Sequence, residues 1–299
     1  MQRRPSGLKL LKFLSSNKFQ ASYLQPREAN YAPLTPLLFL HRAAKIYHDK
    51  TCYLIHDSPV SWKQALHRIQ AFAHILSSQF AIQPYDVVSV LSPNTYAFFE
   101  LHYSVPGIRA VLHSINIRLD AASIAFQLQH SESKLLLVDV EFMRLAESAL
   151  QLLPPETKPR IICIPAPDAP GGSQQVNQVE YEDLVKQGDP NFTLQHPEND
   201  FDAMTLNYTS GTTGLPKGVV THYRGMYLTA MSVIVDFEVP KFFRQLPLVP
   251  MFHCNGWCSP YAAAISGATS YFLRHISAKA VFDIMQKWVP RSDICVFLL

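Results

Sequence analysis

Residues 208–218 combine hydroxyl groups, glycines and one lysine in a single short segment. They read Tyr-Thr-Ser-Gly-Thr-Thr-Gly-Leu-Pro-Lys-Gly. Glycine lets backbone N–H groups turn inward without a Cβ in the way, and successive inward N–H groups form a concave anion site. The hydroxyl groups add donors, and Lys217 adds a full positive charge. The segment therefore predicts a loop that binds a polyphosphate whose charge shifts during a reaction.

This loop differs from a Walker A loop, which requires Gly-Lys followed by Ser or Thr. Here Pro216 precedes Lys217 and a glycine follows it. Residues 204–208 form an apolar run before the loop, and residues 219–220 are both valine. We therefore expect a strand, the loop, a second strand and a helix that starts near Thr221. The alternative is a solvent-exposed turn, but a plain turn requires neither four hydroxyl groups nor a terminal Pro-Lys-Gly.

A second segment, residues 249–258, places an imidazole beside two thiols. It reads Val-Pro-Met-Phe-His-Cys-Asn-Gly-Trp-Cys, with the possible metal ligands His253, Cys254 and Cys258. A structural zinc site usually takes four ligands in two pairs, and no second pair is evident in the sequence. We therefore expect buried or pocket-side thiols here, and no metal.

Both segments resemble motifs of the adenylate-forming (AMP-binding) enzymes, which include acyl-CoA synthetases, coumarate-CoA ligases, luciferases and the adenylation domains of peptide synthetases. The pattern Thr-Ser-Gly-Thr-Thr-Gly-x-Pro-Lys-Gly, the ATP-gripping loop of that superfamily, matches over all ten positions. Residues 249–258 are similar to its second motif, Pro-x-Phe-His-x-x-Gly, in the form typical of plant-type acyl-activating enzymes and medium-chain acyl-CoA synthetases. The resemblance covers about residues 28–294.

The resemblance implies an acid–thiol ligase. Such an enzyme uses ATP and Mg²⁺ to convert a carboxylic acid, here a short- or medium-chain fatty acid or an aromatic acid, to an acyl-adenylate, and then forms acyl-CoA with coenzyme A. The residues implied to hold the β- and γ-phosphates are Thr209, Ser210, Gly211, Thr212, Thr213, Gly214 and Lys217. The implied catalytic residues are Lys217 and His253. The implied substrate pocket contains His253, Gly256 and Trp257.

Each of these roles has a structural alternative. His253 could instead be a packed histidine that supports the end of a sheet, and Trp257 could be an ordinary core residue. His222, after the second strand, matches a frequent position of the family, and we interpret it as structural.

The family pattern also includes parts that we do not find in this sequence. They are the adenine-stacking Tyr-Gly-x-Thr-Glu block, whose glutamate helps to hold magnesium, the ribose-binding aspartate, and the small C-terminal lid domain with its lysine. We therefore expect an incomplete AMP-binding domain at residues 28–299. Its activity is expected to be less than about a thousandth of a full-length enzyme, since single losses of charge-stabilising groups typically cost 10²–10³. The alternative is a non-catalytic remnant that binds nucleotide or a partner without turnover.

The basic residues are concentrated at the start of the chain. Residues 1–27 carry six basic and no acidic residues, so the remainder carries 20 basic and 23 acidic residues of the totals 26 and 23. A mildly acidic body gives no electrostatic case for nucleic-acid binding. The basic start fits either a targeting segment or a disordered extension.

Other features concern the compartment. No apolar run approaches the roughly 20 residues that span a bilayer. Five scattered cysteines and no secretory signal favour reduced thiols inside a cell. The peroxisome and the mitochondrion are both candidate locations, and the last residues are no peroxisomal tripeptide of the Ser-Lys-Leu kind.

Apolar β-branched runs alternate with amphipathic stretches along the chain, which predicts an α/β fold with mostly parallel sheets flanked by helices. Strands are expected at residues 52–55, 86–91, 110–113, 135–139, 160–164, 204–208, 269–273 and 294–298. Helices are expected at residues 37–47, 62–80, 96–105, 121–129, 141–152, 223–235 and 278–288. Residues 165–179 are rich in proline, glycine and glutamine and could be a domain linker, but the resemblance favours a surface loop within one domain.

Overall fold

The computed structural model describes residues 27, 29, 31–166, 178–209, 216–254, 256–288 and 294–295. The chain divides into two compact units, Met1–Pro33 and Leu34–Leu299. Every described helix and strand belongs to the second unit. Of the residues implied to contact phosphate, Ser210, Gly211, Thr212, Thr213 and Gly214 lie outside the described residues.

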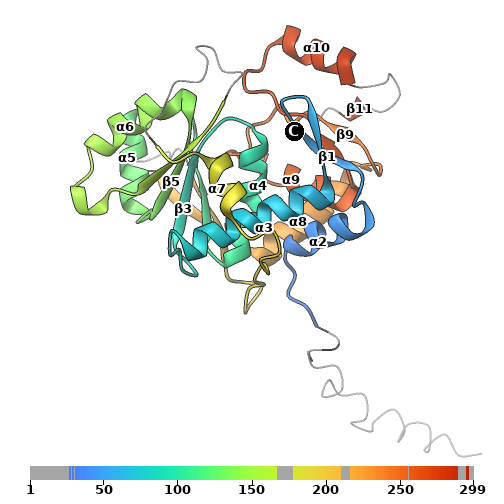
Figure 1. Ribbon diagram of the computed structural model, residues 1–299, viewed down its shortest axis with the longest axis horizontal. Helices are drawn as coiled ribbons and strands as arrows, with labels where there is room; N and C mark the ends of the chain where they lie inside the picture. Colours follow the sequence, from blue (N-terminus) through green and yellow to red (C-terminus); the bar gives the residue numbers. More distant parts are fainter. Residues whose placement is uncertain are drawn as a thin grey trace, which may run out of the picture. The chain divides into compact units, whose positions relative to one another are not determined.

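Two sheets, each mostly parallel, form the framework (Figure 1). The six-stranded sheet has the order β6-β5-β3-β4-β7-β8, in which only β8 is antiparallel to its neighbour. Its strands are β3 (Val87–Leu91), β4 (Val111–Ser114), β5 (Leu135–Asp139), β6 (Arg160–Ile164), β7 (Ala203–Thr209) and β8 (Lys217–His222). The prediction of mostly parallel sheets is confirmed.

The five-stranded sheet has the order β11-β9-β10-β1-β2, with one antiparallel pair, β1 and β2. Its strands are β1 (Thr51–Ile55), β2 (Ser58–Ser61), β9 (Arg244–Gln245), β10 (Thr269–Ser270) and β11 (Ile294–Cys295). β10 ends at Ser270, so the expected strand over 269–273 is too long.

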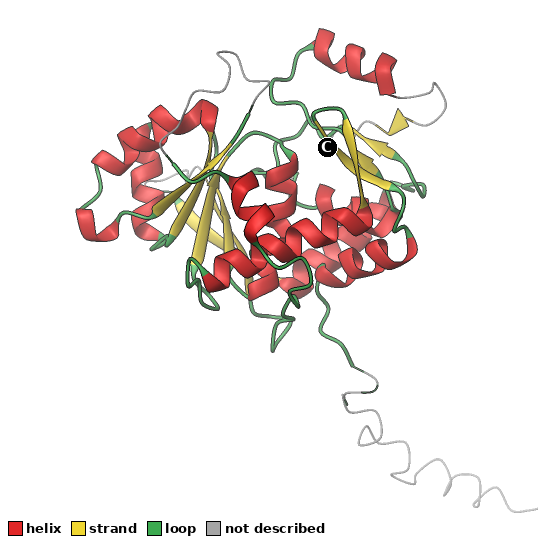
Figure 2. Cartoon of the chain, viewed as in Figure 1, coloured by secondary structure: helices red, strands yellow, loops and turns green. Residues whose placement is uncertain are grey.

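Helices cover both faces of the six-stranded sheet (Figures 1 and 2). The α-helices are α2 (Leu37–Ile46), α3 (Trp62–Ser78), α4 (Tyr96–Ser104), α5 (Ala121–His130), α6 (Met143–Gln151), α7 (Tyr181–Gln187), α8 (Tyr223–Asp236), α9 (Ser259–Ser266) and α10 (Ala278–Trp288). The 3₁₀ helices are η3 (Pro106–Ile108), η4 (Val140–Phe142) and η5 (Pro155–Thr157). α5 and α6 lie on the outer face of the sheet, and α3, α4 and α8 lie on the face toward the second sheet. None of the described helices is long and apolar enough to cross a membrane.

The strand β5 shows why this sheet forms. All five of its residues are buried, and they alternate between two apolar cores. Leu135 and Leu137 join the larger core beneath α3 and α4, whereas Leu136 and Val138 join the smaller core beneath α5 and α6. A strand that is covered on both faces has a continuous apolar sequence. This is why β5 could be predicted from the sequence.

Side-chain caps fix where several helices begin. Ser61 accepts a hydrogen bond from the backbone of Gln64 and completes a capping box at the start of α3. The Thr95 hydroxyl accepts a hydrogen bond from the Phe98 N–H and caps α4. His222 accepts a hydrogen bond from the Gly225 N–H at 2.9 Å and caps α8. The structural interpretation of His222 is therefore confirmed.

A buried ionic network fixes the helices of the central layer. The Arg68 Nε donates to Glu100 at 2.6 Å, and its Nη2 donates to Glu182 at 2.7 Å. Glu100 is fully buried, and it also accepts hydrogen bonds from the hydroxyls of Tyr181, at 2.6 Å, and Tyr53. Burial alone would lower the pKa of Arg68, but Glu100 and Glu182 raise it above its ordinary value. The network joins β1, α3, α4 and α7.

One buried histidine predicts a loss of stability in mild acid. His102 on α4 is buried and bonds through Nδ1 to the Phe98 carbonyl at 2.8 Å. Burial lowers the pKa of His102 from 6.5 to about 4. The His102 side chain therefore binds a proton near pH 6.5 in the unfolded chain, but only near pH 4 in the folded chain. Stability is full above pH 6.5 and falls between these values, by up to about 3 kcal/mol for this group.

The measurement is urea unfolding between pH 7.5 and pH 4. Replacement of His102 by asparagine removes this titrating group, so the slope of unfolding free energy against pH should become shallower over this window. A slope from the buried His113 should remain, because burial also lowers the pKa of His113 to about 4. An unchanged slope in the variant would rule out His102 as the source.

Candidate active site

The predicted phosphate-binding loop closes the hairpin of β7 and β8. Thr209 pairs with Lys217 in the register of the two strands, and both side chains are exposed. The loop therefore leaves the sheet at the carboxyl end of β7, which is parallel to β4. Lys217 makes no ion pair with a described residue. The expected strands on both sides of the loop are confirmed, and the following helix begins at Tyr223, as the range 223–235 predicted.

Aromatic side chains support the start of this loop. The Tyr208 hydroxyl lies 2.7 Å from His130 Nδ1, and the Tyr208 ring centroid lies 5.2 Å from that of the buried His113. Burial raises the pKa of the Tyr208 phenol, so its hydroxyl is protonated at neutral pH and bonds to the imidazole as a neutral group. The last residue before the loop is thereby fixed to α5 and β4.

The second motif forms a chain of tight turns between β9 and α9. The His253 N–H donates to the Pro250 carbonyl at 3.0 Å, and the Gly256 N–H donates to the His253 carbonyl at 2.8 Å. The His253 side chain is exposed, and its Nδ1 lies 3.5 Å from the Cys254 sulfur. Trp257 is partly buried and packs against the larger core. The backbone turns therefore leave the His253 imidazole exposed to solvent.

Gly256 allows these turns to close. A Cβ at this position would lie 2.2 Å from the Pro250 carbonyl oxygen, which is far inside van der Waals contact. We expect Gly256→Ala to lower the free energy of unfolding by about 1–3 kcal/mol, because the loop must shift to admit the methyl group.

Urea denaturation of both variants tests this, with Gly218→Ala as the control. There the nearest atom to a new Cβ is the flexible Leu206 Cδ1 at 3.1 Å, and the expected change is below about 1 kcal/mol. Equal effects of the two substitutions would contradict the close approach at Pro250.

The structure adds two asparagines that the sequence analysis did not identify. Asn94 follows β3, and Asn207 lies on β7; both are buried. Asn94 makes hydrogen bonds to backbone groups of residues 247–251, and Asn207 donates to the Phe252 carbonyl at 3.1 Å. The strand that leads into the phosphate-binding loop is thus bonded to the residue before His253. This contact brings the two predicted motifs together.

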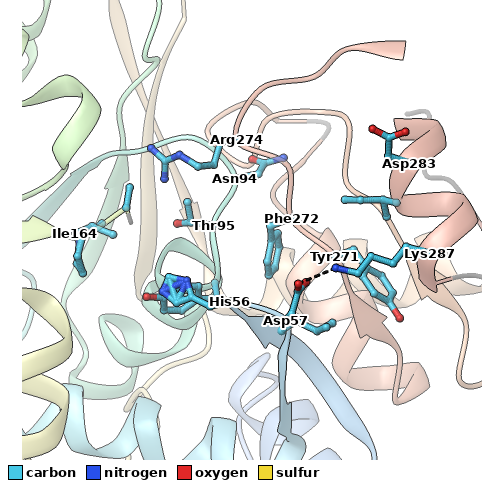
Figure 3. A pocket seen from close by; sticks show the side chains of 15 residues that line it. His56, Asp57, Asn94, Thr95, Ile164, Tyr271, Phe272, Arg274, Asp283 and Lys287 are labelled. Atoms are coloured by element: carbon cyan, nitrogen blue, oxygen red, sulfur yellow. Dashed lines mark hydrogen bonds and ion pairs between the residues drawn. The ribbon is translucent and has the colours of Figure 1, made fainter. Parts of the chain in front are cut away.

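Cavities open at the carboxyl ends of the parallel strands, where open α/β sheets bind ligands. The larger, of about 460 Å³, lies between Thr95 after β3, Ile164 of β6 and Phe272 after β10 (Figure 3). An ion pair of 2.7 Å between Asp57 and Lys287 of α10 borders it. A smaller cavity, of about 250 Å³, is lined by residues of the second motif and by basic side chains, namely Pro250, Phe252, Arg118, Arg274 and His275.

Arg274 lines both cavities and connects the sheets. It forms a bidentate pair with Asp139 at the end of β5, with distances of 2.5 and 2.8 Å, and contacts Glu141 at 3.1 Å. Burial alone would lower the pKa of Arg274, but these hydrogen bonds raise it. The segment after β10 is thereby held at the carboxyl edge of the six-stranded sheet.

The cysteines whose side chains the structure describes are free thiols: Cys52, Cys163 and Cys258 are buried, and Cys254 is exposed. Among the described residues no three His, Cys, Asp or Glu side chains are grouped to hold a metal ion.

Comparison with known proteins identifies the family. A family model described as "AMP-binding enzyme" matches residues 40–298, which is most of the chain. The chain belongs to the AMP-binding enzyme family. Among its relatives is the peroxisomal acetate/butyrate–CoA ligase of Arabidopsis thaliana, which is 38% identical over 269 residues and matches 87% of this chain and 47% of that protein. The peroxisomal trans-cinnamate:CoA ligase of Petunia hybrida is 41% identical over 267 residues, covering 85% and 47%.

Two solved structures share the fold of this chain. The anthranilate CoA ligase AuaEII, in complex with anthranoyl-AMP, superposes with a TM-score of 0.76 at 20% identity and covers 89% of this chain and 50% of its own. The N-terminal domain of FACL13 from Mycobacterium tuberculosis gives 0.73 at 24% identity, covering 85% and 60%. The chain spans about half the length of the curated relatives it matches.

Proposed function

We propose that this chain carries the phosphate-binding and acid-facing parts of an enzyme that activates a carboxylic acid with ATP and transfers the acyl group to coenzyme A. The observation that supports this most is the connection of the two motifs. β7 ends at Thr209, where the loop begins, and Asn207 of the same strand bonds to the residue before His253. A nucleotide phosphate and an acid held at these two places would lie at one edge of one sheet.

The proposed chemistry has two steps. A carboxylate oxygen attacks the α-phosphorus of ATP, the bond from that phosphorus to the bridging oxygen breaks, and pyrophosphate leaves. The thiol of coenzyme A then attacks the acyl carbon of the adenylate, its proton passes to solvent or a base, and AMP leaves. Both steps depend on charge stabilisation and positioning.

The roles of the residues follow from their chemistry. The loop from Thr209 to Gly214 and the Lys217 ammonium would hold the β- and γ-phosphates and stabilise the departing pyrophosphate. The exposed His253 imidazole would donate a hydrogen bond to the carboxylate or the adenylate. Gly256 and Trp257 would shape the acyl pocket. Magnesium bound with ATP would neutralise phosphate charge.

The substrate class is proposed from the relatives. Their names give acetate or butyrate, 2-methylpropanoate and trans-cinnamate, so a short or medium-chain fatty acid or an aromatic acid is the proposed substrate. Two of these relatives are named as peroxisomal, which supports that compartment for the whole protein.

The test is acid-dependent exchange of labelled pyrophosphate into ATP, measured with acetate, butyrate and cinnamate. Exchange that requires an acid and is lost in Lys217→Ala would support the proposal. ATP binding without acid-dependent exchange would favour nucleotide binding without turnover. The absence of both ATP binding and acid-dependent exchange would overturn the proposed function.

A further inference from the structure

The loop that carries His253 is held by an amide from the end of β3. The Asn94 Nδ2 donates to the carbonyl oxygens of Pro247 and Val249, both at 3.0 Å, and its Oδ1 accepts the Met251 N–H at 2.7 Å. Both amide hydrogens are therefore used. The Asn94 side chain is buried, so these backbone groups have little water to replace a lost partner.

A second amide reaches the same loop from β7. The Asn207 Nδ2 donates to the Phe252 carbonyl at 3.1 Å. Asn207 is buried, and its Oδ1 has no hydrogen-bond partner within the part of the chain that the structure describes. Thr209, where the phosphate-binding loop begins, lies two residues further along this strand. The bond from Asn207 therefore joins the strand that leads into the phosphate-binding loop to the residue before His253.

We propose that Asn94 and Asn207 are positioning residues that hold His253 in a fixed place relative to the phosphate-binding hairpin. The role of His253 in acid activation rests on the proposed function; the restraint of the loop does not. The described residues of the segment 246–258 contain no helix or strand, so beyond its own turns the loop depends on side-chain partners for the hydrogen bonds that a sheet or helix would supply. Loss of one amide should let this loop open locally while the sheets stay folded.

Two buried cysteines report on this opening. Cys258 lies at the end of the loop, and burial raises its pKa to about 12. Cys163 lies in β6, and its pKa is also raised to about 12, chiefly by burial. Because a thiolate must be exposed to react, alkylation of Cys258 measures opening of the loop. Alkylation of Cys163 measures opening of the six-stranded sheet in the same molecule.

The experiment follows iodoacetamide labelling of both cysteines at pH 7.5 by peptide mass spectrometry, in the full chain without nucleotide. We expect Asn94→Ala and Asn207→Leu each to raise the rate at Cys258 about 10-fold relative to Cys163, as loss of a buried hydrogen bond of about 1.4 kcal/mol would do. Asn207→Leu keeps the size of the side chain and serves as the second variant if Asn94→Ala does not fold.

Two control variants separate restraint of the loop from general destabilisation. Asn191→Asp changes an exposed asparagine and should leave both rates unchanged. Leu128→Ala truncates the smaller core at α5. It should raise the labelling rates of both cysteines by similar factors and leave their ratio unchanged. An unchanged ratio of Cys258 to Cys163 labelling in both asparagine variants would overturn the proposal.

The labelling ratio distinguishes this proposal from the proposed function. If the asparagine variants raise the labelling ratio but the chain binds no ATP, the restraint of the loop is supported and the proposed function is contradicted. In a chain with acid-dependent exchange, the asparagine variants should lower kcat about 10-fold, as His253→Ala should, while the Kd for ATP changes less than about 2-fold. A change confined to ATP affinity would assign the asparagines to the nucleotide instead.

Discussion

Replacing Arg68 with methionine is expected to lower the free energy of unfolding by about 3–5 kcal/mol, which is the largest stability effect we expect of a single substitution. The reason is the fully buried Glu100, which Arg68 contacts at 2.6 Å. Without the guanidinium, a carboxylate stays in the core with the two tyrosine hydroxyls as its remaining side-chain partners among the described residues. Removing one partner of a buried ion pair costs this much because the other charge is left uncompensated.

The control for this prediction removes both charges. Arg68→Met combined with Glu100→Gln keeps an acceptor for the tyrosine hydroxyls and leaves no buried charge, so it should be less destabilising than Arg68→Met alone. Urea unfolding followed by tryptophan fluorescence measures all the variants. If the double variant loses the sum of the two single effects, the ion pair is not what Arg68 contributes.

Replacing Lys217 with alanine is expected to weaken binding of ATP and of pyrophosphate by about 10- to 100-fold. Lys217 is exposed, lies opposite Thr209 at the entrance of the loop and makes no ion pair with any residue in the described ranges. A hydrogen bond to a charged group contributes about 1.5–3 kcal/mol, and 1.4 kcal/mol corresponds to a factor of ten. Stability should change little, since an exposed side chain is lost.

Isothermal titration of the wild-type and variant chains measures this effect. Lys45→Ala is the matched control, because Lys45 is an exposed lysine on α2. An equal loss of affinity in the two variants would mean that general positive charge, rather than the hairpin, attracts the nucleotide.

The sequence was sufficient to predict the helices and strands whose buried residues follow a regular pattern along the chain. β5 and β6 are continuous apolar runs, and the apolar positions of α3 recur at helical spacing after a capping serine. It was insufficient for α9, whose residues are mostly apolar on every side and buried, so no amphipathic period marks it. β2 contains a proline in four residues and pairs only at the sheet edge.

The residues of the candidate site also divide into those that the sequence indicates and those that only the structure shows. Thr209, Lys217 and His253 are recognised because the types and spacing of neighbouring residues carry the chemistry. Asn94 and Asn207 could not be recognised in this way, because their partners are backbone groups far along the chain. Asn94 and Met251, for example, are 157 residues apart. Which backbone groups face an asparagine is decided by the sheet order, which local sequence does not specify.

The central claim is that the β7–β8 hairpin binds the polyphosphate end of ATP. Competition between inorganic pyrophosphate and ATP for the wild-type chain tests it most directly. We expect that pyrophosphate binds, that it displaces ATP, and that AMP displaces ATP much less effectively. Displacement of ATP by AMP but not by pyrophosphate would contradict the claim, because the nucleotide would then be held by its nucleoside end.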